Sequence, residues 1–178
     1  MKRVVRFTFI LICILGLSLP ACAQSAEPPT VVMVIRHAEK AADQGSDPSL
    51  TEDGAARARS LIEAAGDAGV AAIYSSQFKR TQETVAPLAA HLGLTVTTVE
   101  ISGANMAAYP TLLAEQILAD HRGETVVVVN HSNTVPLIVE ALGGAAVDEI
   151  TEEEYDHFFV VVVPATGPVR TIRAQYGR

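Results

Sequence analysis

The chain has 178 residues, of which 49% are hydrophobic and 19% are charged. This length and composition are typical of one globular domain with its own core, and they exclude a disordered or low-complexity chain. The formal net charge of −7 argues against a general nucleic-acid-binding protein, because such a protein needs a basic surface to contact the phosphate backbone.

The first 23 residues have the pattern of an export signal. The basic residues Lys2, Arg3 and Arg6 precede an apolar run over 7–19, and small residues close the segment. The run is too short for a comfortable membrane-spanning helix. We therefore expect an exported protein, either periplasmic or anchored to the membrane as a lipoprotein. An uncleaved N-terminal anchor is the alternative interpretation.

Two processing routes fit the end of this segment. Cleavage after Ala23 would start the mature chain at Gln24, whereas the four residues that end in Cys22 resemble a lipobox, whose cysteine is acylated. A lipid anchor at Cys22 would tether a soluble domain to a membrane face. Because Cys13 lies inside the signal, the mature chain is expected to have no internal disulfide and no cysteine-based zinc site.

After a short linker over 24–30, strands and helices alternate through one predicted domain over 31–178. Residues 31–35 are a continuous β-branched apolar run, typical of a strand buried on both faces, and a helix is predicted over 54–68 with Thr51 as its N-cap. The later predicted elements are strands over 71–74, 95–99, 126–129, 158–163 and 169–174, and helices over 78–92, 110–118 and 134–142. This alternation predicts an α/β fold, a three-layer sandwich with a mostly parallel central sheet and a closing hairpin.

Arginine or histidine side chains follow three of the predicted strands, within a few residues of the strand end. Arg36 and His37 come after the first strand, Arg80 follows the second strand after a few residues, and His131 follows the fourth. Ligands of open α/β sheets bind outside the carboxyl ends of the strands, so these side chains should meet at one edge. The helix that begins after Ser132 would add its N-terminus. Such a cluster favours an anion, and phosphate fits best because guanidinium groups pair bidentately with its oxygens.

Four segments of the chain resemble those of a known family. They read Val-Ile-Arg-His-Ala-Glu-Lys over 34–40, Leu-Thr-Glu-Asp-Gly over 50–54, Ile-Tyr-Ser-Ser-Gln-Phe-Lys-Arg-Thr-Gln-Glu-Thr over 73–84 and Val-Asn-His-Ser-Asn over 129–133. In this order they resemble the histidine phosphatase superfamily, which includes cofactor-dependent phosphoglycerate mutases and many phosphatases. The resemblance spans about residues 30–165 and implies a histidine phosphatase-like fold.

The resemblance implies a role for each residue of the predicted cluster. His37 would attack phosphorus with one ring nitrogen while a backbone carbonyl holds the other, and water would then hydrolyse the phosphohistidine. Arg36, Arg80 and His131, with Ser132 beside them, would hold the phosphoryl oxygens. These groups supply the positive charge, so no metal or cofactor is expected. The expected partner is a small phosphorylated substrate or a phosphoprotein.

Structural alternatives exist for the same residues. An Arg-His pair after a strand can be purely structural, Arg80 can pair with Glu83 or Thr84 on a helix surface, and His131 can cap a strand end. Ser132 can cap the following helix instead of contacting phosphate.

The sequence does not identify the acid that would protonate the leaving group. One branch of the family has Asp directly after the second histidine, where this chain has Ser132. The mutase-like branch uses a Glu after the third strand, where Glu100 is the nearest candidate. The alternatives are that Glu100 is a solvated loop carboxylate, and that the enzyme has no dedicated acid and acts on substrates with a good leaving group, such as phosphohistidine.

The sequence therefore predicts a phosphatase that acts on a phosphomonoester or phosphoramidate through a phosphohistidine on His37. A phosphoglycerate mutase-type phosphotransferase is one alternative, which the short chain and the expected export disfavour. A non-catalytic phosphate-binding envelope protein is the other. Specificity is expected to come from the loops over 43–49 and 102–109, whose sequences do not name a substrate.

Overall fold

The computed structural model describes residues 27–42 and 44–177, so the predicted signal, including Cys22, and residues 24–26 of the predicted linker lie outside the described residues. None of the helices in the described part combines the length and apolarity that a membrane crossing requires. In chain order the elements are β1 (Thr30–Arg36), α1 (Glu52–Ala65), β2 (Val70–Ser75), α2 (Lys79–Leu92), β3 (Val96–Thr98), α3 (Tyr109–Asp120), β4 (Thr125–Asn130), α4 (Val135–Ala141), β5 (His157–Val163) and β6 (Arg170–Gln175).

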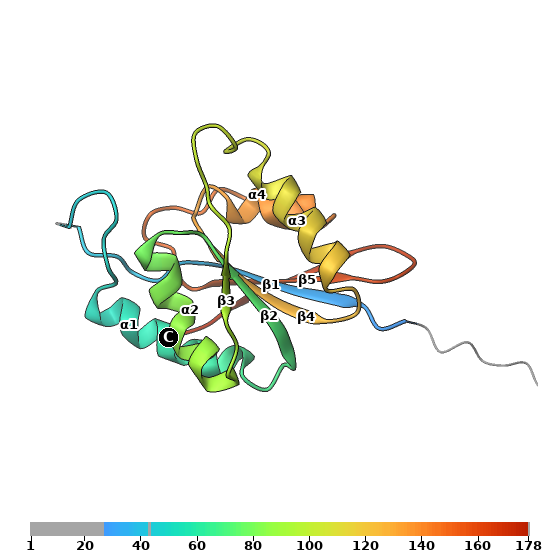
Figure 1. The fold of residues 1–178 in the computed structure, drawn as a ribbon, viewed down its shortest axis with the longest axis horizontal. Helices are drawn as coiled ribbons and strands as arrows, with labels where there is room; N and C mark the ends of the chain where they lie inside the picture. Colours follow the sequence, from blue (N-terminus) through green and yellow to red (C-terminus); the bar gives the residue numbers. More distant parts are fainter. Residues whose placement is uncertain (1–26, 43, 178) are drawn as a thin grey trace, which may run out of the picture.

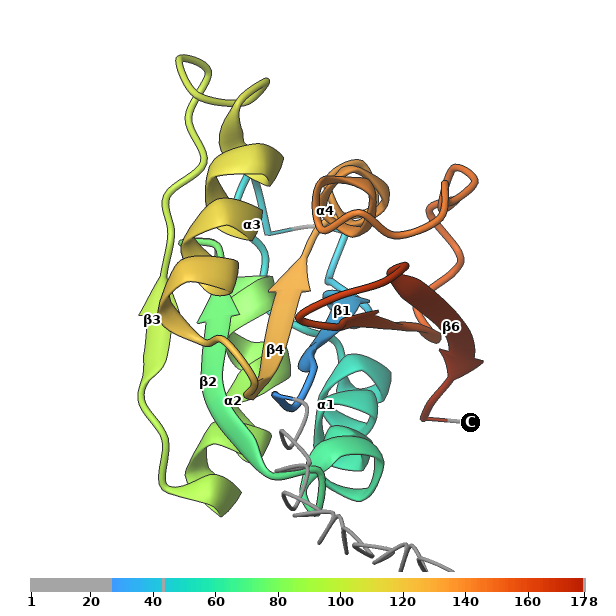
Figure 2. The same ribbon diagram turned by 90° about the vertical axis from the view of Figure 1, so that its right-hand side faces the viewer.

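The six strands form one sheet in the order β3-β2-β4-β1-β5-β6. Strands β1 to β4 run parallel to one another, β5 is antiparallel to β1, and β6 is antiparallel to β5. Figure 2 shows β4 between β2 and β1 in the middle of the sheet. The prediction of a mostly parallel sheet that ends in a hairpin is confirmed.

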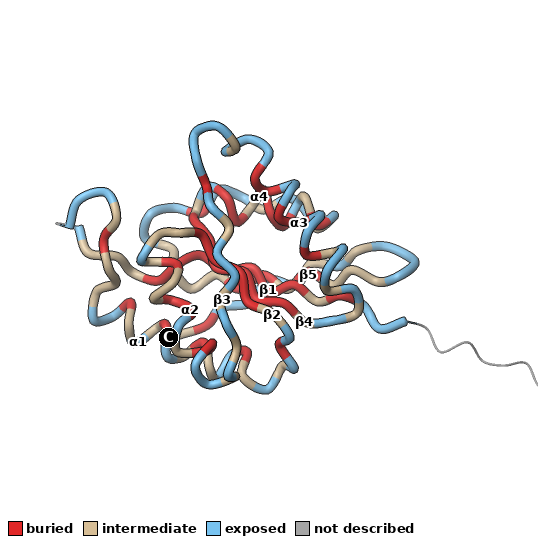
Figure 3. Tube along the Cα trace, in the orientation of Figure 1, coloured by how far each residue is buried: buried red, intermediate tan, exposed pale blue. Residues whose placement is uncertain are grey.

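Helices cover both faces of the sheet, with α1 and α2 on one side and α3 and α4 on the other (Figure 1). Successive residues of β1 point to opposite faces. Val34 therefore packs in the cluster that contains Ile117 of α3, and Ile35 packs in the cluster that contains Leu88 of α2. Figure 3 shows that burial concentrates along the central strands. The predicted three-layer sandwich is confirmed.

Several predicted helix boundaries follow from single residues. The Thr51 hydroxyl accepts a hydrogen bond from the Gly54 amide at 3.1 Å and caps α1, as predicted. Gly93 ends α2 in the left-handed conformation, with φ of 67°, and Pro110 lies in the first turn of α3. The end of α1 differs from the prediction, because the helix stops at Ala65 before a turn that leads into β2.

The strand register sets up the carboxyl edge of the sheet. Arg36 of β1 pairs with Asn130 of β4, and Ser75 of β2 pairs with Val129 of the same strand. Because parallel neighbours end at the same edge, the residues that follow these pairs lie side by side. The topology therefore brings together segments that lie far apart in the sequence.

Candidate active site

A cleft of about 840 Å³ opens at the carboxyl edge of the sheet. Its volume lies in the range of small-molecule sites. Four of the predicted residues line it, namely His37, Arg80, His131 and Ser132. Arg36 is only 1% exposed and is not among the lining residues.

His37 follows directly on the β1–β4 pairing. Its backbone amide donates to the Asn130 carbonyl at 2.8 Å, and its ring Nδ1 lies 2.8 Å from the Ala38 carbonyl. A carbonyl only accepts hydrogen bonds, so Nδ1 carries the proton and Nε2 keeps its lone pair. Burial, assisted by the positive charges of Arg36 and Arg80, lowers the pKa of His37 to about 3. The imidazole is therefore neutral near pH 7, which is the form that a nucleophile requires.

Helix α2 holds the backbone that follows the nucleophile. The Ala38 amide donates to the Thr84 hydroxyl at 2.9 Å, and the same hydroxyl donates to the Arg80 carbonyl at 2.6 Å. Thr84 is fully buried. Residues four apart lie on one face of a helix, so Thr84 positions the His37 loop while Arg80 reaches the cleft. The family resemblance included Thr84 without giving it a role.

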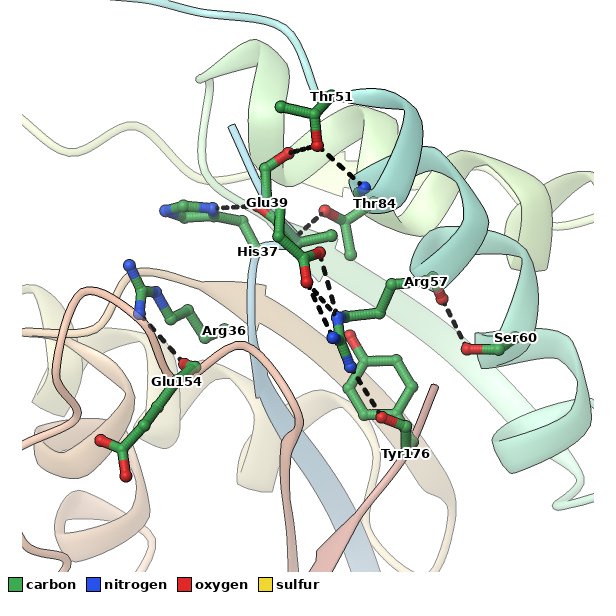
Figure 4. A network of polar contacts seen from close by, with 11 residues as sticks. Arg36, His37, Glu39, Thr51, Arg57, Ser60, Thr84, Glu154 and Tyr176 are labelled. Atoms are coloured by element: carbon green, nitrogen blue, oxygen red, sulfur yellow. Dashed lines mark hydrogen bonds and ion pairs between the residues drawn. The ribbon is translucent and has the colours of Figure 1, made fainter. Parts of the chain in front are cut away.

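Glu39 fixes the other side of this loop. Its carboxylate accepts hydrogen bonds from Nε and Nη2 of Arg57 at distances between 2.7 and 3.0 Å, and Arg57 Nη1 donates to the Tyr176 carbonyl at 2.9 Å. Figure 4 shows the Glu39 carboxylate directed at Arg57. Burial raises the pKa of Glu39, but the Arg57 hydrogen bonds, a backbone hydrogen bond and the charges of Arg57 and Arg36 together outweigh it, so the net pKa is lowered. A Cβ at Gly54 would lie 2.2 Å from the Glu39 carbonyl oxygen, so this position requires glycine.

His131 lies beside His37, with ring centroids 5.5 Å apart. Its Nε2 is 2.9 Å from the Ser76 hydroxyl. The Ser76 hydroxyl is 2.9 Å from the Thr81 hydroxyl, and the Thr81 hydroxyl is 2.8 Å from the Phe78 carbonyl. The carbonyl at the end of this chain can only accept, so Thr81 donates to it and Ser76 donates to Thr81. Ser76 must then accept from His131, and the proton of the neutral ring lies on Nε2.

The remaining ring nitrogen of His131 is an open acceptor. Nδ1 is buried and has no hydrogen-bond partner within the described part of the chain. Burial, followed by the charge of Arg80, lowers the pKa of His131 to about 3. A phosphate dianion in the cleft would act in the opposite direction and favour the charged ring. His131 was expected from the sequence, whereas Ser76 and Thr81, which orient it, lie in the resembling segment over 73–84 and had no assigned role.

Arg36 is held by the segment that precedes β5. Its Nη1 donates to the carbonyls of Thr151 and Glu154, and its Nη2 is 3.4 Å from Oε2 of Glu152. The guanidinium carbon lies 4.1 Å from the centroid of the Tyr155 ring. Arg36 thus supports the floor of the cleft from behind, and only a rearrangement of these partners would free Nη1 for a phosphoryl oxygen.

Arg80 faces the cleft, and its guanidinium carbon lies 4.5 Å from the Phe78 ring centroid. Its nearest acidic partner is Asp47, with 3.9 Å between Nη1 and Oδ1. Glu83, the alternative partner considered from the sequence, instead accepts a hydrogen bond from the Leu50 amide at 2.8 Å. Arg80 is therefore placed to meet an anion in the cleft.

Ser132 lines the cleft but does not cap the following helix. Helix α4 begins at Val135, and its N-cap, Thr134, makes no side-chain capping bond. The amides of Thr134 and Val135 donate to the His131 carbonyl at 3.0 and 2.9 Å. The amides of Thr134 and Val135 are therefore not free for an anion, because the turn after β4 uses them.

The structure does not bring Glu100 into the cleft. The residue is exposed on the loop after β3, and its carbonyl accepts a hydrogen bond from Asn105 at 2.9 Å. The carboxylates that line the cleft are Glu149 and Glu152, and Oε2 of Glu152 lies 3.3 Å from Nζ of Lys40. Sequence reasoning did not find these residues, because no local pattern links the segment over 147–155 to the strand ends.

No three side chains of His, Cys, Asp or Glu are grouped to hold a metal ion in the described ranges 27–42 and 44–177. The positive charge at the cleft comes from Arg80 and Lys40, with Arg36 behind them.

Comparison with known proteins agrees with this geometry. Residues 32–101 match the family model of the histidine phosphatase superfamily, branch 1. Comparison with curated protein sequences gives no match.

Three of the similar solved structures contain a bound molecule. The protein histidine phosphatase SixA with tungstate is 18% identical with a TM-score of 0.57, covering 82% of this chain and 96% of that one.

The second is a mycobacterial glucosyl-3-phosphoglycerate phosphatase with inorganic phosphate, which is 16% identical with a TM-score of 0.58, covering 83% of this chain and 97% of that one. The third is a phosphoserine phosphatase from Entamoeba histolytica with 3-phosphoglyceric acid, which is 16% identical with a TM-score of 0.55, covering 77% and 95%. At these identities the likeness shows the shared fold. By the segment matched over 32–101 and by its fold, the chain is similar to the histidine phosphatase superfamily, branch 1.

Proposed function

We propose that the chain is a phosphatase that hydrolyses a phosphomonoester or phosphoramidate through a phosphohistidine on His37. The observation that carries the proposal is the state of the His37 ring. Its Nδ1 is held by the Ala38 carbonyl, so the lone pair of Nε2 is available in a cleft that Arg80 and His131 also line. A neutral imidazole beside fixed cations suits attack on a phosphoryl group.

In the first step Nε2 of His37 bonds to phosphorus while the bond from phosphorus to the leaving group breaks. The leaving group keeps that electron pair. Arg80 and Lys40 balance the charge on the three non-bridging oxygens, and His131 does so once the bound phosphoryl dianion has favoured protonation of its ring. In the second step a water oxygen bonds to phosphorus, the phosphorus–nitrogen bond breaks, and its electron pair returns to Nε2. One water proton passes to solvent, and inorganic phosphate leaves.

The leaving group also needs a proton. Glu100 lies outside the cleft, so we assign it no part in this step. A phenolate can depart first and take its proton from solvent, and the ring of a phosphohistidine departs as neutral imidazole when its other nitrogen is already protonated. The proposal therefore favours substrates with good leaving groups.

The experiment that tests the proposal is turnover of p-nitrophenyl phosphate by the full chain and by His37→Ala. We expect the substitution to abolish turnover and to remove an acid-labile, alkali-stable label that a phosphorylated substrate leaves on the wild type. His91→Ala is the matched control, because His91 is exposed at the end of α2. Substantial turnover by His37→Ala would overturn the mechanism. Phosphate binding without any turnover would indicate the non-catalytic alternative.

A further inference from the structure

The cleft has an apolar wall that phosphoryl transfer does not use. Its members are Ile101, Met106, Pro136, Leu137, Val147 and Ile150. They come from three separate stretches, namely the loop after β3, helix α4 and the segment that leads to β5. Three stretches thus converge with apolar side chains on the same cavity that contains His37.

Two members of this wall are unusually exposed. Met106 is 44% exposed and Leu137 is 49% exposed. Among the described residues only four large hydrophobic side chains are exposed to this degree, and these two share one cleft. A single exposed apolar side chain needs no explanation, but an apolar lining in a concave site is typical of a surface that a ligand covers.

The apolar surface begins next to the phosphoryl site. Phe78 lines the cleft, with its ring centroid 5.2 Å from that of His131 and 4.5 Å from the guanidinium carbon of Arg80. The first atoms of a leaving group bound to phosphorus would therefore meet an aromatic ring. Aromatic groups pack against such a ring in offset or edge-to-face arrangements.

The charges in the cleft disfavour a second anionic group on the substrate. Glu149 and Glu152 line it, and Glu152 lies 3.3 Å from the ammonium of Lys40. Of the cations that line the cleft, Lys40 is thus already paired with Glu152. Arg80 is the cation that the proposed mechanism uses to bind the phosphoryl group. A carboxylate or second phosphate on the leaving group would meet like charges and an apolar wall.

We infer that the substrate is an aryl phosphate, a phosphomonoester whose leaving group is apolar and aromatic and packs against Phe78, Met106 and Leu137. This inference rests on the proposed phosphatase function and names its substrate class. A cleft of about 840 Å³ holds a phosphoryl group together with an aromatic leaving group. A phenolate also departs without the general acid that Glu100 does not supply.

The test is a series of phenyl phosphates with methyl, ethyl and butyl groups at the 4-position. The alkyl group scarcely changes the basicity of the phenolate, so the series varies apolar contact alone. Full burial gives about a fourfold gain per methylene. Because the cleft is open, we expect kcat/KM to rise roughly 10- to 100-fold from phenyl to 4-butylphenyl phosphate. A flat series would overturn the inference while leaving the proposed phosphatase function intact.

A pair of leucine substitutions locates the effect. Leu137→Asn should lower the ratio of kcat/KM between the butyl and phenyl substrates at least threefold. Leu112→Asn is the matched control, because Leu112 is 55% exposed on α3 and does not line the cleft. We expect Leu112→Asn to keep both the ratio and the turnover. An equal response of the two variants would contradict the inference.

Binding of phosphonates separates this inference from the proposed function. Calorimetry with phenylphosphonate and 4-butylphenylphosphonate requires no turnover. If the full chain turns over no phosphate ester but binds the butyl compound at least tenfold more tightly, the proposed function fails and the ligand class stands. If both phosphonates bind equally, the ligand class is wrong. 3-Phosphoglycerate supplies a second arm, and a kcat/KM above that of phenyl phosphate would also contradict the inference.

Discussion

The two sides of the cleft are built in different ways. The side formed by β1, its loop and α2 is polar and tied together by hydrogen bonds, from Ala38 to Thr84 and from Glu39 to Arg57. The side formed by the loop after β3, α4 and the segment before β5 presents exposed apolar side chains such as Leu137. The hydrogen-bonded polar residues and the exposed apolar residues therefore lie on different sides of the cleft. The first suits chemistry and the second suits substrate selection.

The largest effect on the polar side after loss of the nucleophile is expected from Arg80→Ala. Removal of one charged donor from an oxyanion site costs about 10²- to 10³-fold in rate. We expect kcat/KM for p-nitrophenyl phosphate to fall by this factor. Lys79→Ala is the control, because Lys79 is exposed at the same end of α2. Equal losses in the two variants would show that general surface charge matters and that Arg80 has no special position.

A smaller loss of activity is expected from the residue that orients His131. Ser76→Ala removes the acceptor of the His131 Nε2 proton, 2.9 Å away. One neutral hydrogen bond corresponds to a loss of about five- to tenfold in kcat/KM. The imidazole nitrogen shifts of His131 should also move as the tautomer changes. Ser75→Ala is the control, since the Ser75 hydroxyl donates to the Ser76 carbonyl and not to the ring.

Acidification should lower the free energy of unfolding through His37 and His131. His37 and His131 have pKa values of about 3 in the folded protein, whereas an unfolded histidine titrates near 6.5. Below that pH the unfolded chain binds more protons, so the free energy of unfolding falls as the pH falls from 6.5 towards 3. We expect a loss of about 2 kcal/mol per histidine between pH 7 and 5. Urea unfolding should show a shallower pH dependence in His37→Gln than in the wild type or in His91→Gln.

The smallest effect is expected from Glu100, at the base of the loop on the apolar side. General acid assistance contributes about 10²- to 10⁴-fold. Because Glu100 is exposed and does not line the cleft, Glu100→Gln should change turnover of both alkyl and aryl phosphates by less than about twofold. A selective loss with alkyl phosphates would show that the loop closes and brings this carboxylate to the leaving group.

Much of the fold could be predicted because its signals are local. Runs of β-branched residues, the cap at Thr51 and the glycine at 93 each act within a few residues of chain. His37, Arg80 and His131 could be predicted too, because each follows a strand and parallel strands end at one edge.

The rest of the site depends on contacts between distant segments. Glu152 and Tyr155 meet Arg36 from the far end of the chain, and no periodic pattern in the sequence signals such a contact. Ser76 orients His131 only because two strand ends lie side by side. The position of Glu100 after the third strand suggests an acid, but Glu100 is exposed and does not line the cleft, although Ile101 and Ser102 of the same loop do.

The position of β1 in the sheet has a consequence for the order of assembly during synthesis. Residues 31–36 pair on one side with 125–130 and on the other with 158–163. A ribosome makes β1 long before either neighbour, so this apolar strand waits with both edges unpaired, a state prone to association with other chains. The two histidines become neighbours only after β4 has been made, and Arg36 gains its carbonyl partners later still. The cleft is thus among the last parts of the molecule to form, and a chain truncated before residue 151 would lack the carbonyl partners of Arg36.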